Sequence, residues 1–377
     1  MMLLSHDGSG DDSPVQPREV LIVGGGIAAI EALMALADLG DRRLRLRLVA
    51  GHPSFRLRPQ ILGEPWGGPP LRIDLARLCH AFGARFVSGT VTGVDADARH
   101  VTTAGGETQG YERLLLAPGA QPSLAYESTR TLGFGVLPKT LASRTSGSVA
   151  IVIPPGTTWT LPAYELALLI AGEGRDVRVL THEEVPLEVF GPGTHAATRA
   201  LLDRHRVLVE TDGAPDPGSP VTDLADTVIS LPLLNGPAMT GLPLDGQGYV
   251  RVDARMTVPG VKDIYAAGDA TSGAVKQGGL AAQQADTAAA EIVRSCAGNT
   301  SRVPYAPVLR GKLTTAGGQE LYLRRALDGL DAGRADERPL WRPPSIVCAW
   351  RLARWLSYHR GDLEHYTLDH VARPASV

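Results

Sequence analysis

The chain has 377 residues and a formal net charge of −3 at pH 7. This length accommodates two or three domains with sizeable hydrophobic cores, and the charge gives no electrostatic footprint for nucleic acid. The three cysteines form no CxxC pair and no metal-ligand spacing, so we expect neither a disulfide framework nor a metal site. This cysteine usage predicts a reducing compartment, the cytoplasm.

Residues 1–17 are rich in Gly, Ser, Asp and Pro, and they lack the basic start of a signal peptide. This composition predicts a disordered lead-in. Further along, no apolar run is long enough to span a bilayer, because charged residues interrupt the best candidate at Glu31 and Asp38.

A strand, a glycine-rich turn and a helix are predicted between Arg18 and Asp38. Four apolar residues run into the sequence Gly24-x-Gly26-x-x-Ala29, and helical spacing follows at once. Gly24 would make the turn, Gly26 would let a pyrophosphate approach the backbone, and Ala29 would let the helix pack closely on the strand. The helix N-terminus would add N–H groups and a partial positive charge for the phosphates.

A second parallel strand is predicted from Leu44 to Val49. The acid that usually holds an adenosine ribose is replaced by Ala50, which disfavours NAD here and matters less for FAD. In the following loop, Arg58 could meet a phosphate or the cofactor's ring edge, or it could be an ordinary solvated arginine. After a helix at 71–82, a short strand would place Val91 near an adenine, and turn signals between 95 and 106 predict a small antiparallel insert.

Two later strands also end in small residues. Leu114 to Leu116 runs into Ala117-Pro118-Gly119, and the strand beginning at Ile264 runs into Gly268-Asp269. Together with the opening glycines, these motifs resemble those of the pyridine nucleotide–disulfide oxidoreductase superfamily over about residues 18–300. One departure is that Pro118 replaces the threonine of the superfamily's second motif.

The resemblance implies a bound FAD. Asp269 would hydrogen-bond its ribityl chain, and Gly268 would let the flavin pass close to the backbone. The residues expected to contact FAD are Gly24, Gly26, Ile27, Ala28, Ala50, Arg58, Val91, Ala117, Gly119, Gly268, Asp269, Lys276, Gln277, Gly278 and Leu280.

The stretch from Lys276 to Asp286, KQGGLAAQQAD, is similar to the sulfide:quinone oxidoreductase and type II NADH dehydrogenase branch of that superfamily. The similarity implies a helix that begins at about Gly279 under the isoalloxazine and stabilises the reduced, anionic flavin. Lys276 and Gln277 would lie at the flavin edge. An ordinary surface helix led by glycine is the alternative.

A second βαβ unit is predicted at 138–246, with strands at 149–153, 177–180 and 207–209. In the superfamily this unit binds NAD(P)H through its own glycine motif. Here the corresponding loop contains Pro154, Pro155 and Trp159 and keeps one glycine, so it is ill-suited to a pyrophosphate. Trp159 also stands where sulfide:quinone oxidoreductases carry a reactive cysteine, which disfavours sulfide chemistry.

Glu165 is expected on the first turn of the next helix, where the superfamily keeps an acid near the reactive face of the flavin. A partly buried carboxyl there could exchange protons at catalytic pH. The alternative is that it only stabilises the helix dipole. The predicted catalytic residues are Glu165, Trp159 and Lys276.

The last segment, 301–377, corresponds in the family to a dimer face, a quinone site or a membrane patch. Trp341, Trp350 and Trp355 lie here among arginines, which is typical of a membrane interface. Helix packing on the flavin domain or on a partner subunit is the favoured alternative, because Trp355 leaves the apolar arc of the predicted helix. Cys348 is expected to be a buried, inert thiol.

The predicted fold class is α/β, with two doubly wound Rossmann-like domains and a C-terminal cap. An FAD-binding domain (18–137 and 247–300) carries an inserted NAD(P)-like domain (138–246), and an interface domain (301–377) follows. The predicted function is an FAD-dependent oxidoreductase that moves two electrons between a small organic or sulfur-containing substrate and an acceptor, with a degenerate NAD(P)H site. A quinone-coupled dehydrogenase, peripheral at the inner membrane face, and a non-catalytic FAD-binding protein are the alternatives. A homodimer is left open.

Overall fold

The computed structural model describes residues 16–57, 72–127, 129–131, 147–273, 275–297, 305–344 and 348–359. Residues 1–15 of the predicted lead-in and Arg58 lie outside these ranges.

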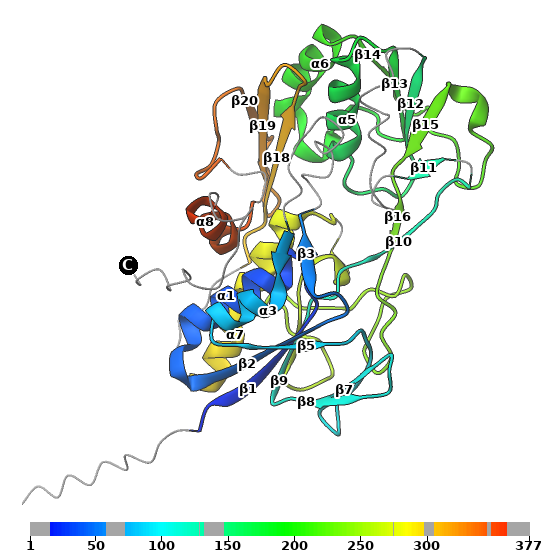
Figure 1. Cartoon of the computed structure of the whole chain (residues 1–377). Helices are drawn as coiled ribbons and strands as arrows, with labels where there is room; N and C mark the ends of the chain where they lie inside the picture. The colour runs from blue at the N-terminus through cyan, green and yellow to red at the C-terminus, as the bar shows by residue number, and fades with distance from the viewer. Residues whose placement is uncertain are drawn as a thin grey trace, which may run out of the picture.

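A five-stranded parallel sheet forms the lower half of the molecule in Figure 1. Its strand order is β17 (Ile264–Ala266), β9 (Arg113–Leu116), β1 (Arg18–Val23), β2 (Leu44–Ala50) and β5 (Arg85–Ser88). Its helices are α1 (Ile27–Gly40), α3 (Leu75–Ala81) and α7 (Gly278–Ala297). The predicted strand–turn–helix at the start of the chain is confirmed, because β1 leads directly through the glycines into α1.

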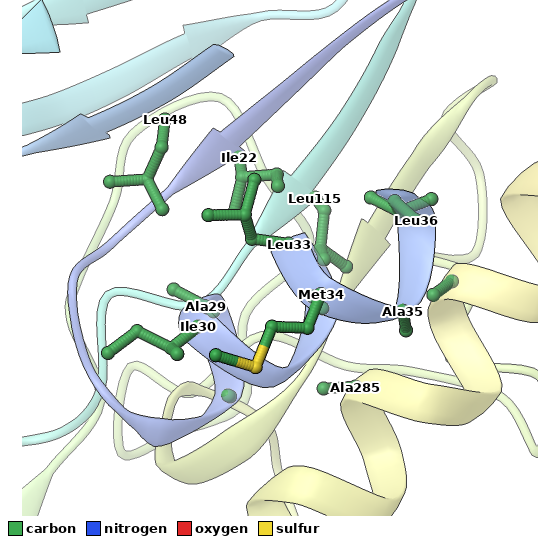
Figure 2. Close-up of a cluster of buried hydrophobic side chains, with 14 of the residues drawn as sticks. Ile22, Ala29, Ile30, Leu33, Met34, Ala35, Leu36, Leu48, Leu115 and Ala285 are labelled. Atoms are coloured by element: carbon green, nitrogen blue, oxygen red, sulfur yellow. The ribbon is translucent and has the colours of Figure 1, made fainter. Parts of the chain in front are cut away.

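Helix α1 is buried between the sheet and α7 (Figure 2). Ile22, Leu48 and Leu115 contribute side chains from β1, β2 and β9, and all three are completely buried. Ala285 of α7 faces α1, and its small side chain allows the two helices to approach closely. Each fully buried aliphatic side chain of this kind contributes about 1.5–3 kcal/mol, so this core fixes the glycine turn at the head of α1.

The predicted antiparallel insert is confirmed as a three-stranded sheet of β6 (Val91–Asp95), β7 (His100–Thr103) and β8 (Thr108–Gly110). A separate two-stranded pair, β3 (Ser54–Arg56) and β4 (Arg72–Asp74), precedes α3. Asp74 caps α3 by accepting a hydrogen bond from the Arg77 N–H at 2.9 Å.

A second parallel sheet forms the upper half (Figure 1). Its order is β11 (Arg130–Thr131), β15 (Thr227–Ser230), β12 (Val149–Ile153), β13 (Val177–Thr181) and β14 (Val207–Glu210). Helices α5 (Leu161–Ala171) and α6 (His195–Arg204) belong to this unit, and short 3-10 turns lie at 41–43, 188–190, 192–194, 222–224 and 268–270. The three strands predicted for this unit are confirmed.

The two sheets are joined by an antiparallel pair of connecting strands, β10 (Gln121–Ser123) and β16 (Leu233–Asn235). Beyond this pair, β11 already lies in the second sheet, and Thr240 bridges back to Gly93 of β6. The chain therefore crosses between the sheets before β11 and has returned at Thr240, and the domain boundaries at 138 and 246 stay predictions.

The C-terminal segment adds an antiparallel sheet of β18 (Val308–Thr314), β19 (Glu320–Ala326) and β20 (Arg334–Asp336). Leu309 and Leu313 of β18 are completely buried in the same core as α5. The free edge of β18 is covered by α7: the Gln283 side chain accepts from the Val308 N–H at 2.9 Å and donates to the Val308 carbonyl at 3.0 Å. Covering this edge satisfies backbone groups that could otherwise pair with another chain.

The last helix, α8 (Trp350–Tyr358), packs against α1 with Leu352, Trp355 and Leu356 in the core. Trp355 is only 5% exposed, so its predicted place outside the apolar arc is wrong, whereas the predicted packing on the first unit is confirmed. In the described part of the chain, no helix combines the length and the apolar character needed to cross a membrane.

Candidate functional site

The carboxyl ends of β1, β2, β9 and β17 meet at one edge of the first sheet. Gly24 has φ of 123°, and a Cβ there would lie 2.0 Å from the Ala117 carbonyl oxygen. Its N–H donates to the Val49 carbonyl at 2.8 Å. Gly24 therefore binds the ends of three strands into one tight turn that no larger residue can form.

Gly26 lies at the open side of this turn. Among the described residues, no atom lies within 4 Å of the position that its Cβ would take. The Ile30 N–H donates to the Gly26 carbonyl at 3.0 Å, so α1 begins here and presents its first N–H groups. Open space, a bare backbone and a helix N-terminus together fit a pyrophosphate.

Two side chains of the glycine fingerprint bring it into contact with two later segments of the chain. A Cβ on Gly268 would lie 2.9 Å from the Ala28 methyl, and a Cβ on Gly278 would lie 2.7 Å from Ile27 Cδ1. The fingerprint, the Gly-Asp turn and the start of α7 are therefore in direct contact through Ile27 and Ala28. Gly268 has φ of 80°, which favours glycine at this contact.

The other side of the cradle is formed where β2 and β9 end. Ala50 is the last residue of β2, and the following Gly51 lies against Thr90, immediately before Val91. Gly119 follows β9 with φ of 81° and no described atom within 4 Å of its Cβ position. Ala50, Val91, Ala117 and Gly119 thus lie on the elements predicted for them, and their contacts with FAD stay predictions.

Gln284 is a residue of this region that the sequence reasoning missed. Its side chain, 8% exposed on α7, accepts from the Gly268 N–H at 2.7 Å and interacts with the Thr271 hydroxyl. It holds the turn that carries Asp269. The sequence feature that could have indicated it is the pair Gln283-Gln284, which lies in the segment similar to the sulfide:quinone oxidoreductase branch.

Lys276 lies in the loop between that turn and α7. Its ammonium group donates to the carbonyls of Thr271 and Gly273, the second at 2.7 Å, and lies 3.7 Å above the Tyr249 ring. Burial lowers the pKa of Lys276 to about 8, against the opposing charges of Asp269 and Asp245. These bonds hold the loop in place, and a catalytic role for Lys276 stays a prediction.

Gln277 caps α7 and joins it to the C-terminal sheet. Its side chain accepts from the Leu280 N–H at 2.8 Å and donates to the Arg310 carbonyl at 3.1 Å. The Leu280 side chain packs into the core of the second unit. Leu280 is therefore engaged by protein contacts at both its N–H and its side chain, and its contact with FAD stays a prediction.

The loop after β12 is where the second unit would receive a dinucleotide. Trp159 is partly buried and packs on Phe190, with ring centroids 5.8 Å apart. The neighbouring Thr158 hydroxyl accepts from the Lys276 N–H at 3.3 Å, so this loop touches the segment that leads into α7. Trp159 is therefore part of the second unit's own packing, and its predicted catalytic role is untested.

Glu183, just beyond β13, occupies the position where a Rossmann unit usually keeps its ribose-binding acid. It is 2% exposed, and its carboxylate accepts from the hydroxyls of Thr160 at 2.9 Å, Tyr164 at 2.7 Å and Thr181 at 3.1 Å. Burial raises its pKa, and the hydroxyls oppose that shift. Sequence reasoning missed Glu183, although an acid directly after a second strand is a recognisable signal.

Glu165 is the fifth residue of α5, so its predicted place in the first helical turn is wrong. It is 5% exposed, and the hydroxyl and backbone N–H of Thr314, at the end of β18, lie close enough to oppose the rise of its pKa. Burial raises the pKa of Glu165 to about 7, and Lys312 opposes the shift. These contacts assign Glu165 to the joint between α5 and the C-terminal sheet.

We expect Glu165→Gln to remove one source of pH-dependent stability. Because the folded pKa of Glu165 is raised above its ordinary 4.5 to about 7, its contribution is fully present below pH 4.5 and is lost as the pH rises through 7. Relative to wild type, the variant should gain on the order of 3 kcal/mol in unfolding free energy between pH 4.5 and 8. Urea unfolding at both values measures this, and an unchanged difference contradicts the assignment.

Comparisons with known proteins agree with this architecture. The chain is 26% identical over 206 residues to the sulfide-quinone reductase of Aquifex aeolicus, covering 49% of this chain and 48% of the relative. It is 28% identical over 296 residues to an NADH dehydrogenase-like protein of Mycobacterium tuberculosis, covering 66% and 72%. The match thus spans about half of the first relative's length. No family model matches the chain.

Among solved structures, the sulfide:quinone oxidoreductase of Aquifex aeolicus superposes with a TM-score of 0.75 at 17% identity, covering 92% of this chain and 91% of that one. This likeness shows the fold. Together with the sequence relatives, it confirms the resemblance that the three glycine motifs predicted.

Proposed function

We propose that this chain, whose homologues include sulfide-quinone reductase and NADH dehydrogenase-like proteins, binds FAD and moves two electrons between a small organic or sulfur-containing substrate and an acceptor. The observation that carries the proposal is the open cradle at Gly26, with the Gly268 turn and the start of α7 packed against it. FAD would supply the two-electron chemistry. Gly24, Gly26 and Asp269 would hold it.

The chain's own residues would orient the cofactor and tune its surroundings. Gln284 fixes the Gly268 turn, and Lys276 fixes the loop that follows it. The N-terminus of α7 brings a partial positive charge to the same place, which favours an anionic ring system. In this arrangement Lys276 would act by positioning the loop.

We also propose that the two parallel sheets are separate domains and that β18–β20 with α8 form the C-terminal cap. The antiparallel pair β10 and β16 would be the linker between the domains. This division supports a cofactor site on the first domain and a remodelled site on the second.

The second domain is proposed not to serve NAD(P)H. Pro154 and Pro155 offer no N–H to a pyrophosphate, and Trp159 occupies the turn by packing on Phe190. The acid that would hold a ribose, Glu183, already accepts from three hydroxyls. A nicotinamide dinucleotide would therefore meet fewer phosphate donors than a glycine-rich turn offers, and a ribose acceptor that is already engaged.

We expect NADH and NADPH to bind weakly and to reduce the flavin slowly. Stopped-flow bleaching of the flavin should stay far below ordinary turnover of roughly 10 per second at micromolar NAD(P)H. Bleaching at that rate would overturn this proposal and leave FAD binding untouched, because the flavin has to be bound before NAD(P)H can bleach it.

A quinone-coupled dehydrogenase is the second candidate, favoured by the name and fold of the Aquifex aeolicus relative. Oxidation of the reduced protein by a quinone in lipid vesicles, faster than by a soluble acceptor, would support it. A protein that holds FAD without catalysis is the remaining alternative. It would be favoured if no donor bleached the flavin under anaerobic conditions.

A further inference from the structure

The C-terminal sheet carries a row of three arginines. Arg310 of β18 is directly opposite Arg324 of β19, and Arg324 is directly opposite Arg334 of β20. Residues that are paired in this way point to the same face of a sheet. Like charges in directly opposite positions destabilise a sheet, so this row needs compensation.

The compensation decreases from the outer strand inward. Arg334 forms an ion pair with Asp336 at 2.9 Å, and its side chain is 69% exposed. Arg324 approaches Asp331 only to 3.8 Å, and that carboxylate already accepts from the N–H groups of Ala326 and Gly333. Arg310 is partly buried, and within the described ranges its guanidinium has no carboxylate partner.

Neighbouring groups do not neutralise Arg310. Lys312 and Glu320 form an ion pair with each other, and the Tyr322 hydroxyl donates to the same Glu320 carboxylate. Burial raises the pKa of the nearby Cys348 thiol to about 12, so that thiol is uncharged at neutral pH. Burial lowers the pKa of Arg310, Cys348 opposes that shift, and the charge of Arg324 adds to it.

We propose that Arg310 and Arg324 form a binding site for an oxyanion group, a phosphate or a carboxylate, with Arg334 as its outer approach. Paired guanidinium groups match such groups with bidentate hydrogen bonds. The ligand would relieve the repulsion along the row. The site stands apart from FAD binding and does not depend on the proposed reaction, although the Arg310 carbonyl is bonded by Gln277, the cap of α7.

The test is calorimetric titration of the purified chain with inorganic phosphate and, separately, with succinate. Saturable binding of at least one of them is expected at low ionic strength. The one that binds more tightly shows whether the site prefers a phosphate or the carboxylate of an organic molecule. Arg310→Gln should weaken binding about 10-fold or more, since hydrogen bonds to charged groups are among the strong ones. The control Arg45→Gln removes an equally charged but 66% exposed arginine on β2 and should leave binding unchanged.

A second measurement keeps the proposal testable if Arg310→Gln does not fold. In the wild-type chain, the ligand should protect Arg310 from an arginine-modifying reagent such as phenylglyoxal, as read by peptide mass spectrometry. Absence of saturable binding overturns the proposal. If Arg45→Gln weakens binding as much as Arg310→Gln does, the binding reflects general charge and the proposal is overturned. Failure of the ligand to protect Arg310 from the reagent also overturns it.

Discussion

The Gly26→Val variant should fold normally and purify without its yellow colour. The position is open, so the new Cβ meets no atom of the described residues within 4 Å. A valine side chain would fill the space where a pyrophosphate approaches the backbone. FAD content after denaturation, read by absorbance and chromatography, should therefore fall to near zero, while circular dichroism stays that of wild type.

Two other glycines make this experiment interpretable. Gly329→Val tests the general cost of a valine, because Gly329 is also open and lies far from the cradle, between β19 and β20. It should keep its full FAD content. Gly24→Val should not fold, because its Cβ would lie 2.0 Å from the Ala117 carbonyl oxygen. A Gly26→Val protein that keeps stoichiometric FAD would end the assignment of the cradle.

The sequence could predict those parts of the fold that depend on local pattern. The run from Val20 through Gly24 into α1 has the periodicity of a buried strand, then a turn, then a helix, and each appears in the structure. The strands of the second unit were equally recognisable from their apolar runs. Local spacing carries this information because strands and helices bury side chains at fixed intervals.

Other parts depend on contacts between distant residues, which spacing cannot reveal. Glu165 was read from its neighbours in α5, but its partner is Thr314, almost 150 residues away. In the sequence, Glu183 is an acid that follows a strand, and only the folded structure shows that three hydroxyl groups donate to it. The predicted position of Trp355 outside the apolar arc is wrong for the same reason, because contact with α1 determines which side of α8 is buried.

Glu31 makes a contact of this kind with residues more than 300 positions later in the chain. It is a completely buried acid in the N-terminal half of α1. Its carboxylate accepts from the N–H groups of Arg351 at 2.6 Å and Leu352 at 2.8 Å, which are the second and third residues of α8. A side chain from one helix therefore caps another helix more than 300 residues later.

We expect Glu31→Ala to destabilise the attachment of α8 to the rest of the molecule. Two backbone N–H groups would lose their acceptor in a buried place, and a cavity would form against α1, so the loss should be about 2–4 kcal/mol. Hydrogen exchange of the peptide covering 350–358 should become fast before the rest of the chain exchanges. Glu31→Gln keeps an acceptor oxygen and should lose less.

The pH dependence distinguishes Glu31 from an ordinary cap. Burial and the charge of Asp286 raise the pKa of Glu31 to about 7, so its contribution is complete below pH 4.5 and is lost as the pH rises through 7. Exchange of α8 should therefore accelerate between pH 5 and 8, after correction for the intrinsic rate, in wild type but not in Glu31→Gln. Asp286 also forms an ion pair with Arg351, the residue whose N–H Glu31 accepts.

Asp38 is the matched control for this prediction. Its carboxylate pairs with the Arg351 guanidinium at 2.9 Å, yet it is 57% exposed. An exposed ion pair contributes at most about 1 kcal/mol, so Asp38→Ala should leave the exchange of α8 nearly unchanged. If Glu31→Ala and Asp38→Ala lose the same small amount, the buried cap does not hold α8. The apolar contacts of Leu352, Trp355 and Leu356 with α1 would then be sufficient by themselves.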